Sequence, residues 1–305
     1  MLREEDILKR LIVADSLFRQ IDIVEENYDI LPDNKKHIGT YIEYSDLQEL
    51  RTEFLDELED TIISWVYSSE KFYRLKEKAM KNGKPESVAC SEIYRKARNK
   101  FRGHRLDENL LTQGQMGELL LFHFIQRCMK AVPILRKMPI TTSPNHERFG
   151  ADAIHYKIEN GRHIIFLGEA KTYTSEYKFN NAFTDAISSI LSTYDNHRKE
   201  LNLYVHEDFL DEEMNQVAEA YLQNMLNPVE IHLVNLVTYN ETQKIELTNE
   251  NDIKGQIKRI ISNRYARMDK DKIDIKNHPI LNRITYIVFP VWRLDELVRD
   301  FQSRI

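Results

Sequence analysis

The sequence predicts an α/β protein in which helices flank a mixed β-sheet, and three observations indicate this fold. Apolar residues recur at helical spacing between Thr112 and Lys130. Two β-rich runs then flank Asn160-Gly161, a dipeptide that strongly favours a tight β-hairpin. Another helical stripe and further β-rich runs follow this hairpin. The core order is therefore helix, strand, hairpin, helix, strand, which is typical of a sheet covered by helices.

Residues 1–110 are expected to form a mostly helical N-terminal region. An apolar stripe at helical spacing crosses residues 47–81, and its members are Leu50, Phe54, Leu58, Ile62, Trp65 and Val66. Glycine and proline in residues 81–85 terminate this long helix or helix pair. We place a second domain at residues 111–305, and we expect the stripe of the N-terminal region to dock a protein partner.

A basic cluster covers residues 95–105, with the sequence RKARNKFRGHR. Lysine and arginine in such a cluster can bind nucleic-acid phosphates, but similar clusters are more often the solvated face of a helix. Tyr173 and Tyr177 also have two interpretations, because a tyrosine either stacks on bases or packs in the core. Both alternatives stay open at the level of sequence.

Glu118 lies in the helix predicted for residues 112–130, where apolar residues follow it four, seven and eleven positions later. A carboxylate on an apolar stripe is costly unless a partner or a metal ion neutralises it. The alternative places Glu118 at the edge of the stripe, facing solvent. Gly114 and Gly117 on the same helix would permit a close approach to another backbone.

The hairpin at Asn160-Gly161 brings three charged residues to one face. Both central residues of a type I′ turn need φ > 0, which Asn-Gly provides, so the turn sets the register of its two strands. In this register Asp152 faces Glu169, and Lys171 lies two residues further along the same face. Facing residues have Cβ atoms about 4.5–5.5 Å apart, where like charges repel. Two carboxylates held in this way require a cation, and a divalent ion with oxygen ligands is the simplest one.

The alternative is an exposed hairpin end with solvated carboxylates. Residues 164–168, which lead to Glu169, are apolar on both faces and therefore predict a buried central strand. A charged triplet at the end of a buried strand favours a metal site, in which a lysine can position or activate water. His155 falls on the opposite face and is expected to be structural, and a loop histidine such as His146 is usually only solvated.

The remaining elements complete the expected sheet and its helical cover. Strands are predicted at residues 131–135, 201–205, 229–238 and 284–289. Helices are predicted after Asn180, from 208 to 226 and from 294 to 305. Pro133 confines the first of these strands to a sheet edge or a strand end, because proline cannot donate to a ladder.

The bulk composition excludes several classes of protein. The 305 residues are 42% hydrophobic and 30% charged, and no run of about 20 apolar residues would span a membrane. An acidic N-terminus and only two cysteines argue against a signal peptide and a disulfide framework, so we expect a cytoplasmic protein. The net charge of −6 argues against a DNA coat protein but not against a nuclease. No Gly-rich phosphate loop is present, so the chain should not itself hydrolyse ATP.

The order of Glu118, Asp152 and Glu169-Ala-Lys171 resembles the motif of the PD-(D/E)xK nuclease superfamily. This resemblance covers residues 112–200. It implies a restriction-endonuclease-like core, with the acidic pair and the lysine on the second and third strands. Ala151-Asp152 replaces the Pro-Asp dipeptide of that superfamily.

Three segments are also similar to the HamA family of the Hachiman anti-phage system: QMGELL at residues 115–120, FGAD at 149–152 and LGEAK at 167–171. The resemblance to this family extends over most of the chain. It implies a nuclease effector that forms a complex with a helicase subunit, HamB, and that cleaves DNA when infection is sensed.

The sequence therefore favours a Mg²⁺-dependent deoxyribonuclease, with Mn²⁺ as an alternative ion. Asp152 and Glu169 would ligate the metal together with the Ala170 carbonyl, and Glu118 would hold a metal-bound water or a second ion. Lys171 would orient the attacking water and stabilise charge on the scissile phosphate. The alternative function is a catalytically silent nuclease fold that binds DNA or a helicase partner.

Overall fold

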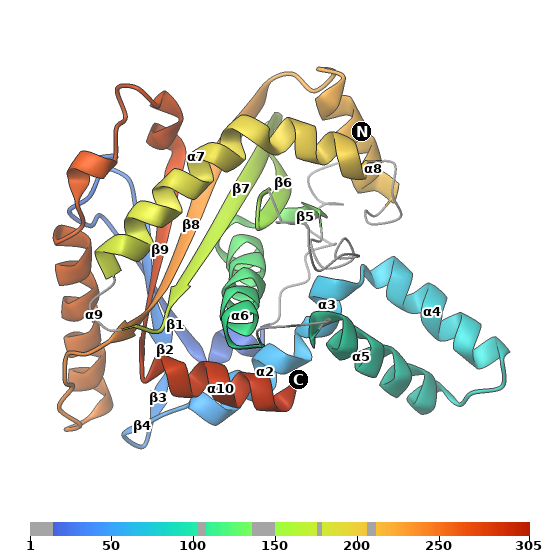
Figure 1. Cartoon of the computed structure of the whole chain (residues 1–305), viewed down its shortest axis with the longest axis horizontal. Helices are drawn as coiled ribbons and strands as arrows, with labels where there is room; N and C mark the ends of the chain where they lie inside the picture. The colour runs from blue at the N-terminus through green and yellow to red at the C-terminus, as the bar shows by residue number, and fades with distance from the viewer. Residues whose placement is uncertain (1–14, 103–107, 136–149, 176–178, 206–211) are drawn as a thin grey trace.

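A computed structural model describes residues 15–102, 108–135, 150–175, 179–205 and 212–305 (Figure 1). In this part of the chain a seven-stranded mixed sheet has the order β1-β2-β9-β8-β7-β6-β5. Its strands are β1 (Ile21–Glu26), β2 (His37–Ile42), β5 (Val132–Leu135), β6 (Ala153–Glu159), β7 (Arg162–Tyr173), β8 (Val229–Glu241) and β9 (Ile284–Trp292). The predicted α/β class, with a mixed sheet flanked by helices, is confirmed.

Helices cover both faces of the sheet. The described helices are α2 (Arg51–Asp60), α3 (Ile62–Val66), α4 (Ser69–Lys81), α5 (Glu86–Arg102), α6 (Glu108–Phe124), α7 (Phe179–Tyr204), α8 (Glu212–Leu222), α9 (Glu250–Ala266) and α10 (Leu294–Arg304). Smaller elements are the strand pair β3 (Tyr44–Ser45) and β4 (Gln48–Glu49), the π-turn η2 (Ile125–Met129) and the 3₁₀ turns η1 (Leu17–Arg19), η4 (Lys270–Lys272) and η5 (Pro279–Arg283). None of the described helices is long and apolar enough to cross a membrane.

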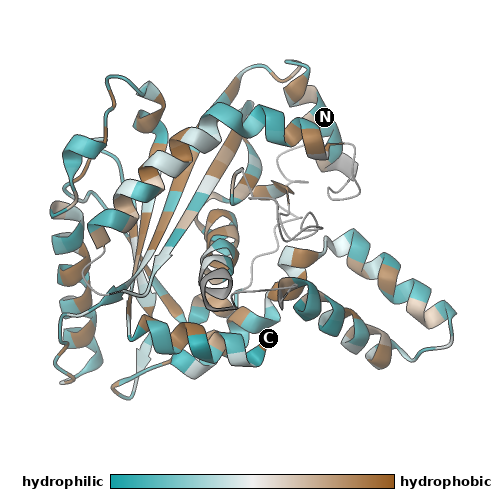
Figure 2. Cartoon of the chain, in the orientation of Figure 1, coloured by the Kyte–Doolittle hydropathy of each residue, from teal (hydrophilic) through white to brown (hydrophobic). Residues whose placement is uncertain are grey.

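The alternation of side chains along β7 separates two hydrophobic cores. Ile165 and Leu167 pack with α7, α8 and α9 on one face. Ile164 and Phe166 pack with α2, α3, α5, α6 and α10 on the other face. Figure 2 shows apolar residues concentrated on the strands between these layers. The central strand is therefore buried on both sides, as its continuous apolar run predicts.

The hairpin register is confirmed along the whole length of β6. The turn residues Asn160 and Gly161 have φ values of 51° and 74°. The pairs run from Glu159 with Arg162 to Ala153 with Gly168. The predicted strand at 131–135 is β5, and it lies at the edge of the sheet as Pro133 requires.

Several predictions about the other elements are wrong. The described residues of the N-terminal region are mostly helical, but β1 and β2 also belong to the central sheet, which was not predicted, and β2 pairs with β9. Residues 47–81 form three short helices instead of one or two. Residues 201–204 continue α7 and form no strand. The segment around Val24 and Tyr41 packs in the same core as α7, so the N-terminal region contributes directly to the body.

The apolar stripe of the N-terminal region is not a docking surface. Phe54, Leu58, Ile62 and Trp65 are each at most 1% exposed. They pack with α6 and α10 in the second core. Helical periodicity identified which residues share a face, but that face is covered by the rest of this chain. The boundary between residues 110 and 111 stays a prediction.

Candidate active site

The acidic pair lies where the β6–β7 hairpin enters the body of the protein. Asp152 and Glu169 are 8% and 6% exposed. The ladder ends at Ala153 and Gly168, one pair before the predicted facing pair. The Asp152 amide instead donates to the Gly168 carbonyl over 3.0 Å. The backbone therefore leaves the regular ladder at Asp152, and the simple picture of two directly facing carboxylates needs this correction.

Hydrogen bonds orient both carboxylates. Asp152 Oδ2 accepts from the Ala170 amide over 2.9 Å, which places this carboxylate beside the residue that follows Glu169. Glu169 Oε1 accepts from the Lys171 ammonium over 2.9 Å. Thr193 of α7 lies 3.3 Å from Glu169 Oε2 and donates to it. The structure thus brings Asp152, Glu169 and Lys171 together as predicted, and each carboxylate has a defined direction.

Glu200 of α7 holds the segment that precedes Asp152. Its Oε2 atom accepts from the Ala151 amide over 2.8 Å. Gly150 has a φ of 148°, and a Cβ atom there would lie 2.1 Å from Glu200 Oε1. Only glycine fits both requirements. The sequence analysis did not identify Glu200; the glycine two residues before Asp152 was the one local signal that the backbone there is constrained.

The helix α6 crosses the opposite face of β7 at the level of the site. A Cβ atom at Gly117 would lie 2.4 Å from Thr172 Oγ1 and 3.5 Å from Ala170 Cβ. This confirms the close approach predicted for Gly117, whereas a Cβ atom at Gly114 would meet nothing within 4 Å. Glu118 is half-buried, and the helix that carries it covers the face of β7 away from Glu169.

Within the described residues, no three His, Cys, Asp or Glu side chains lie together in a way that could hold a metal ion. Asp152, Glu169 and Glu118 therefore do not form a three-carboxylate cluster in this arrangement. The donor set at the hairpin end is a pair of carboxylates, and the part played by Glu118 stays a prediction.

Asn235 is a site residue that the sequence analysis missed. It pairs in parallel register with Glu169 and lies between Val234 and Leu236, which face the other core. Adjacent strands are about 4.8 Å apart, so Asn235 and Glu169 are neighbours on the α7 face. Asn235 is fully buried, and neither atom of its amide has a hydrogen-bond partner in the described part of the chain. An asparagine inside an apolar strand was the available signal.

The other candidate residues that the structure describes make contacts of their own. His155 is fully buried with its ring against Phe122, at 5.3 Å between centroids, so it is structural as predicted. Tyr173 donates to Asp185, and this hydrogen bond raises the pKa of Tyr173 to about 12. His146 and Tyr177 lie outside the described residues.

Comparison with known proteins identifies the family. The profile of the HamA family matches residues 17–305, which is nearly the whole chain. A search of curated proteins finds no match. The matched region includes the hairpin, α6 and every strand of the described sheet. The chain therefore belongs to the HamA family, the family of the Hachiman HamA subunit.

Proposed function

We propose that this protein is a Mg²⁺-dependent DNA nuclease that acts as an effector in Hachiman anti-phage defence. Membership in the HamA family supports the defence role. The observation that carries the nuclease activity is the buried pair Asp152 and Glu169 beside the Lys171 ammonium. Buried carboxylates that adjoin a lysine at a strand end suit metal-assisted hydrolysis of a phosphodiester.

The residues around the acidic pair fit a hard divalent cation. Mg²⁺ usually binds through one or two carboxylates and completes its shell with water and substrate phosphate. Asp152 and Glu169 supply the carboxylates. The Asn235 amide beside Glu169, which has no partner among the described residues, fits a site that orders further water. We assign Mg²⁺ or Mn²⁺ to Asp152 and Glu169. The Ala170 carbonyl is a further proposed ligand of this ion, and Glu118 is proposed to hold a metal-bound water or a second ion.

A bound divalent ion would supply Lewis acidity and lower the pKa of a coordinated water. The protein's own residues orient the reacting groups and stabilise the charge on the phosphate. The Lys171 side chain is 25% exposed, so its ammonium can reach a phosphate oxygen and stabilise the charge that develops there. Glu169 holds this ammonium, and Thr193 holds Glu169 in turn.

Family membership also supports work within a multi-subunit defence complex. We propose a helicase as the partner, because the sequence lacks a phosphate loop for ATP and its net charge of −6 leaves part of the DNA affinity to another subunit. In this arrangement the helicase restrains the nuclease until infection is sensed. A free nuclease of this kind would degrade the DNA of its own host.

Cleavage of supercoiled plasmid DNA in Mg²⁺, by the full chain alone and with the helicase, tests the proposal. Lys171→Ala and Glu169→Gln should each lower the rate by at least about 100-fold, because each removes a group that acts on the phosphate or the ion. Lys254→Ala is the matched control, because Lys254 also pairs with a glutamate, Glu43, but lies on α9.

Wild-type cleavage rates in a folded Lys171→Ala protein would overturn the assignment. A wild-type complex that binds both DNA and the helicase, yet never cuts, would favour the catalytically silent module instead.

A further inference from the structure

The segment from Ser69 to Arg102 has a charge opposite to that of the rest of the chain. It consists of α4, α5 and their connection, and we call it the basic hairpin. It contains eleven Lys or Arg and four Glu, a net charge of +7, whereas the whole chain has −6. The other 271 residues therefore carry −13. Such a separation of charge indicates a local surface for an anionic partner.

The uncompensated cations follow one face of α4. Lys71, Arg74, Lys78 and Lys81 recur at spacings of three and four residues, which places them on one side of a helix. None of these four residues forms an ion pair with any residue that the structure describes. The stripe extends over about 15 Å of helix, at 1.5 Å per residue. Glu70 and Glu77 lie beside the stripe, which therefore keeps a net charge of +2 with four cations available.

The acidic residues of α5 are already neutralised inside the basic hairpin. Glu86 pairs with Lys76 at 2.8 Å. Glu92 pairs with both Lys84 and Lys96. These glutamates consequently do not screen the stripe on α4, and their pairs tie the two helices and their connection together.

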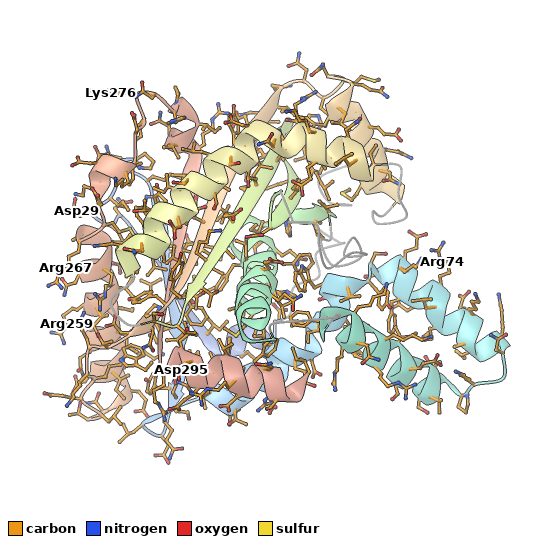
Figure 3. All side chains as sticks on the ribbon, in the orientation of Figure 1. Asp29, Arg74, Arg259, Arg267, Lys276 and Asp295 are labelled. Carbon is orange, nitrogen blue, oxygen red and sulfur yellow. The ribbon has the colours of Figure 1, made fainter. Side chains whose placement is uncertain are left out.

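The basic hairpin extends away from the sheet. In Figure 1, α4 and α5 lie together at one side of the molecule, and α4 buries no residue. Arg74, labelled in Figure 3, extends from α4 into solvent. Figure 2 shows both helices as mostly hydrophilic. Phe72 and Leu75 of α4 pack against the second core, whereas the cationic face of the helix stays available for binding.

A shallow pocket on the basic hairpin has the composition of a phosphate site. Arg95, Ser87 and Ser91 line it, together with Val88 and the ion pair of Lys84 with Glu92. Ser87, Ser91 and Arg95 are four residues apart along α5 and so share one face. Lysine, arginine and serine side chains are the groups that commonly contact phosphate oxygens in DNA complexes.

Two exposed aromatic rings accompany these cations. Tyr73 and Tyr94 are 57% and 38% exposed, and the Lys76 ammonium lies 5.3 Å from the Tyr73 ring centroid. Exposed rings beside cations suit a nucleic-acid strand, on whose bases aromatic side chains stack. An acidic protein surface would pair with the cations, but it has no phosphate for the pocket and no bases to stack on the exposed tyrosine rings.

We propose that the basic hairpin binds the phosphate backbone of DNA, independently of base sequence. The proposal deepens the nuclease function, on which it rests for its biological purpose, by assigning the surface that holds the substrate. It explains how an acidic protein acquires affinity for an anionic polymer. The row on α4 would contact consecutive phosphates, and the pocket on α5 would hold one more.

Fluorescence anisotropy with a short labelled DNA duplex of random sequence, in EDTA and over a range of salt concentrations, tests this assignment. The full-length triple variant Arg74→Gln, Lys78→Gln, Lys81→Gln should bind at least about tenfold more weakly, and its log–log salt slope should fall by about 2 to 3. The control Lys258→Gln, Arg259→Gln, Arg267→Gln loses the same charge from exposed positions on and after α9. It should bind DNA like the wild type.

Unchanged DNA affinity of the Arg74 triple variant would overturn the proposal, as would an equal loss in both triple variants. A variant that keeps its DNA affinity but loses the helicase would show that the basic hairpin binds an acidic protein surface instead. EDTA prevents metal-dependent cleavage, so the binding result stands even if the Glu169→Gln experiment contradicts the nuclease function. Thermal unfolding of each variant verifies its fold, which these exposed positions should leave unchanged.

Discussion

The acidic site and the basic hairpin differ in almost every physical respect. Asp152 and Glu169 are less than 9% exposed and are oriented by hydrogen bonds from the backbone, Lys171 and Thr193. The basic hairpin projects its charges from α4, which buries no residue. Chemistry on a phosphate needs groups held in fixed directions, whereas attraction to a charged polymer needs only exposed cations. The net charge of −6 for the whole chain therefore indicates neither the acidic site nor the basic hairpin.

The largest expected effect in this comparison concerns the close contact between α6 and β7 behind the acidic site. Gly117→Ala should lower the free energy of unfolding by about 1–3 kcal/mol, because its Cβ would lie 2.4 Å from Thr172 Oγ1 and overpack the contact with β7. Gly114→Ala on the same helix meets nothing within 4 Å and should raise stability by up to about 1 kcal/mol. Urea unfolding of both variants provides the measurement. Equal changes in the free energy of unfolding in the two variants would mean that α6 does not pack closely on β7.

The next largest effect is that of acidification, which should lower the stability of the fold without acting on the basic hairpin. Burial lowers the pKa of His37 to about 4, with help from Lys35, and that of His123 to about 3. Both histidines stay neutral in the folded protein, while the unfolded chain takes up protons below about pH 6.5. Stability should therefore fall as the pH drops from 6.5 toward 4, by about 1 kcal/mol per histidine for each pH unit.

Unfolding in urea at pH 7.5 and 5.5 measures this loss, and His123→Leu should reduce it. The basic hairpin contains no histidine, so its affinity for DNA should not follow this transition. A His123→Leu protein that loses as much stability as the wild type would assign the acid sensitivity to other groups.

The smallest effect concerns Asn235. Asn235→Leu should raise the free energy of unfolding in metal-free buffer by about 1 kcal/mol, because it removes a buried amide that has no partner among the described residues. The same variant should cut DNA more slowly if that amide serves the site. Differential scanning calorimetry and the plasmid assay test the two parts. A destabilised variant would show that Asn235 has a structural partner and is not reserved for a ligand.

The hairpin and its charged residues were predictable because their information is local. Asn160-Gly161 specifies the turn, and counting outward from it specifies the register. Asp152, Glu169 and Lys171 then follow without any knowledge of the rest of the sheet. The apolar run before Glu169 also revealed a strand that is buried on both faces.

The features that sequence reasoning missed depend on contacts between distant segments. β2 pairs with β9, about 250 residues further along the chain, and no local pattern in residues 37–42 shows this. Glu200 and Thr193 reach the site from α7 through tertiary packing. The stripe that includes Phe54 shows a different error, because it was predicted to dock a partner and is buried in the core. An apolar helical face has the same sequence pattern in both cases.

Binding of Mn²⁺ to the full-length protein, measured by isothermal titration calorimetry, tests the central claim most directly. The wild type should bind Mn²⁺ with a heat signal that Asp152→Asn abolishes, because the substitution removes one of the two proposed carboxylate ligands. Asp295→Asn is the matched control, since Asp295 is exposed on α10 and pairs with Arg299; it should bind like the wild type. Equal binding by the wild type and by folded Asp152→Asn would contradict a metal site at the end of the β6–β7 hairpin.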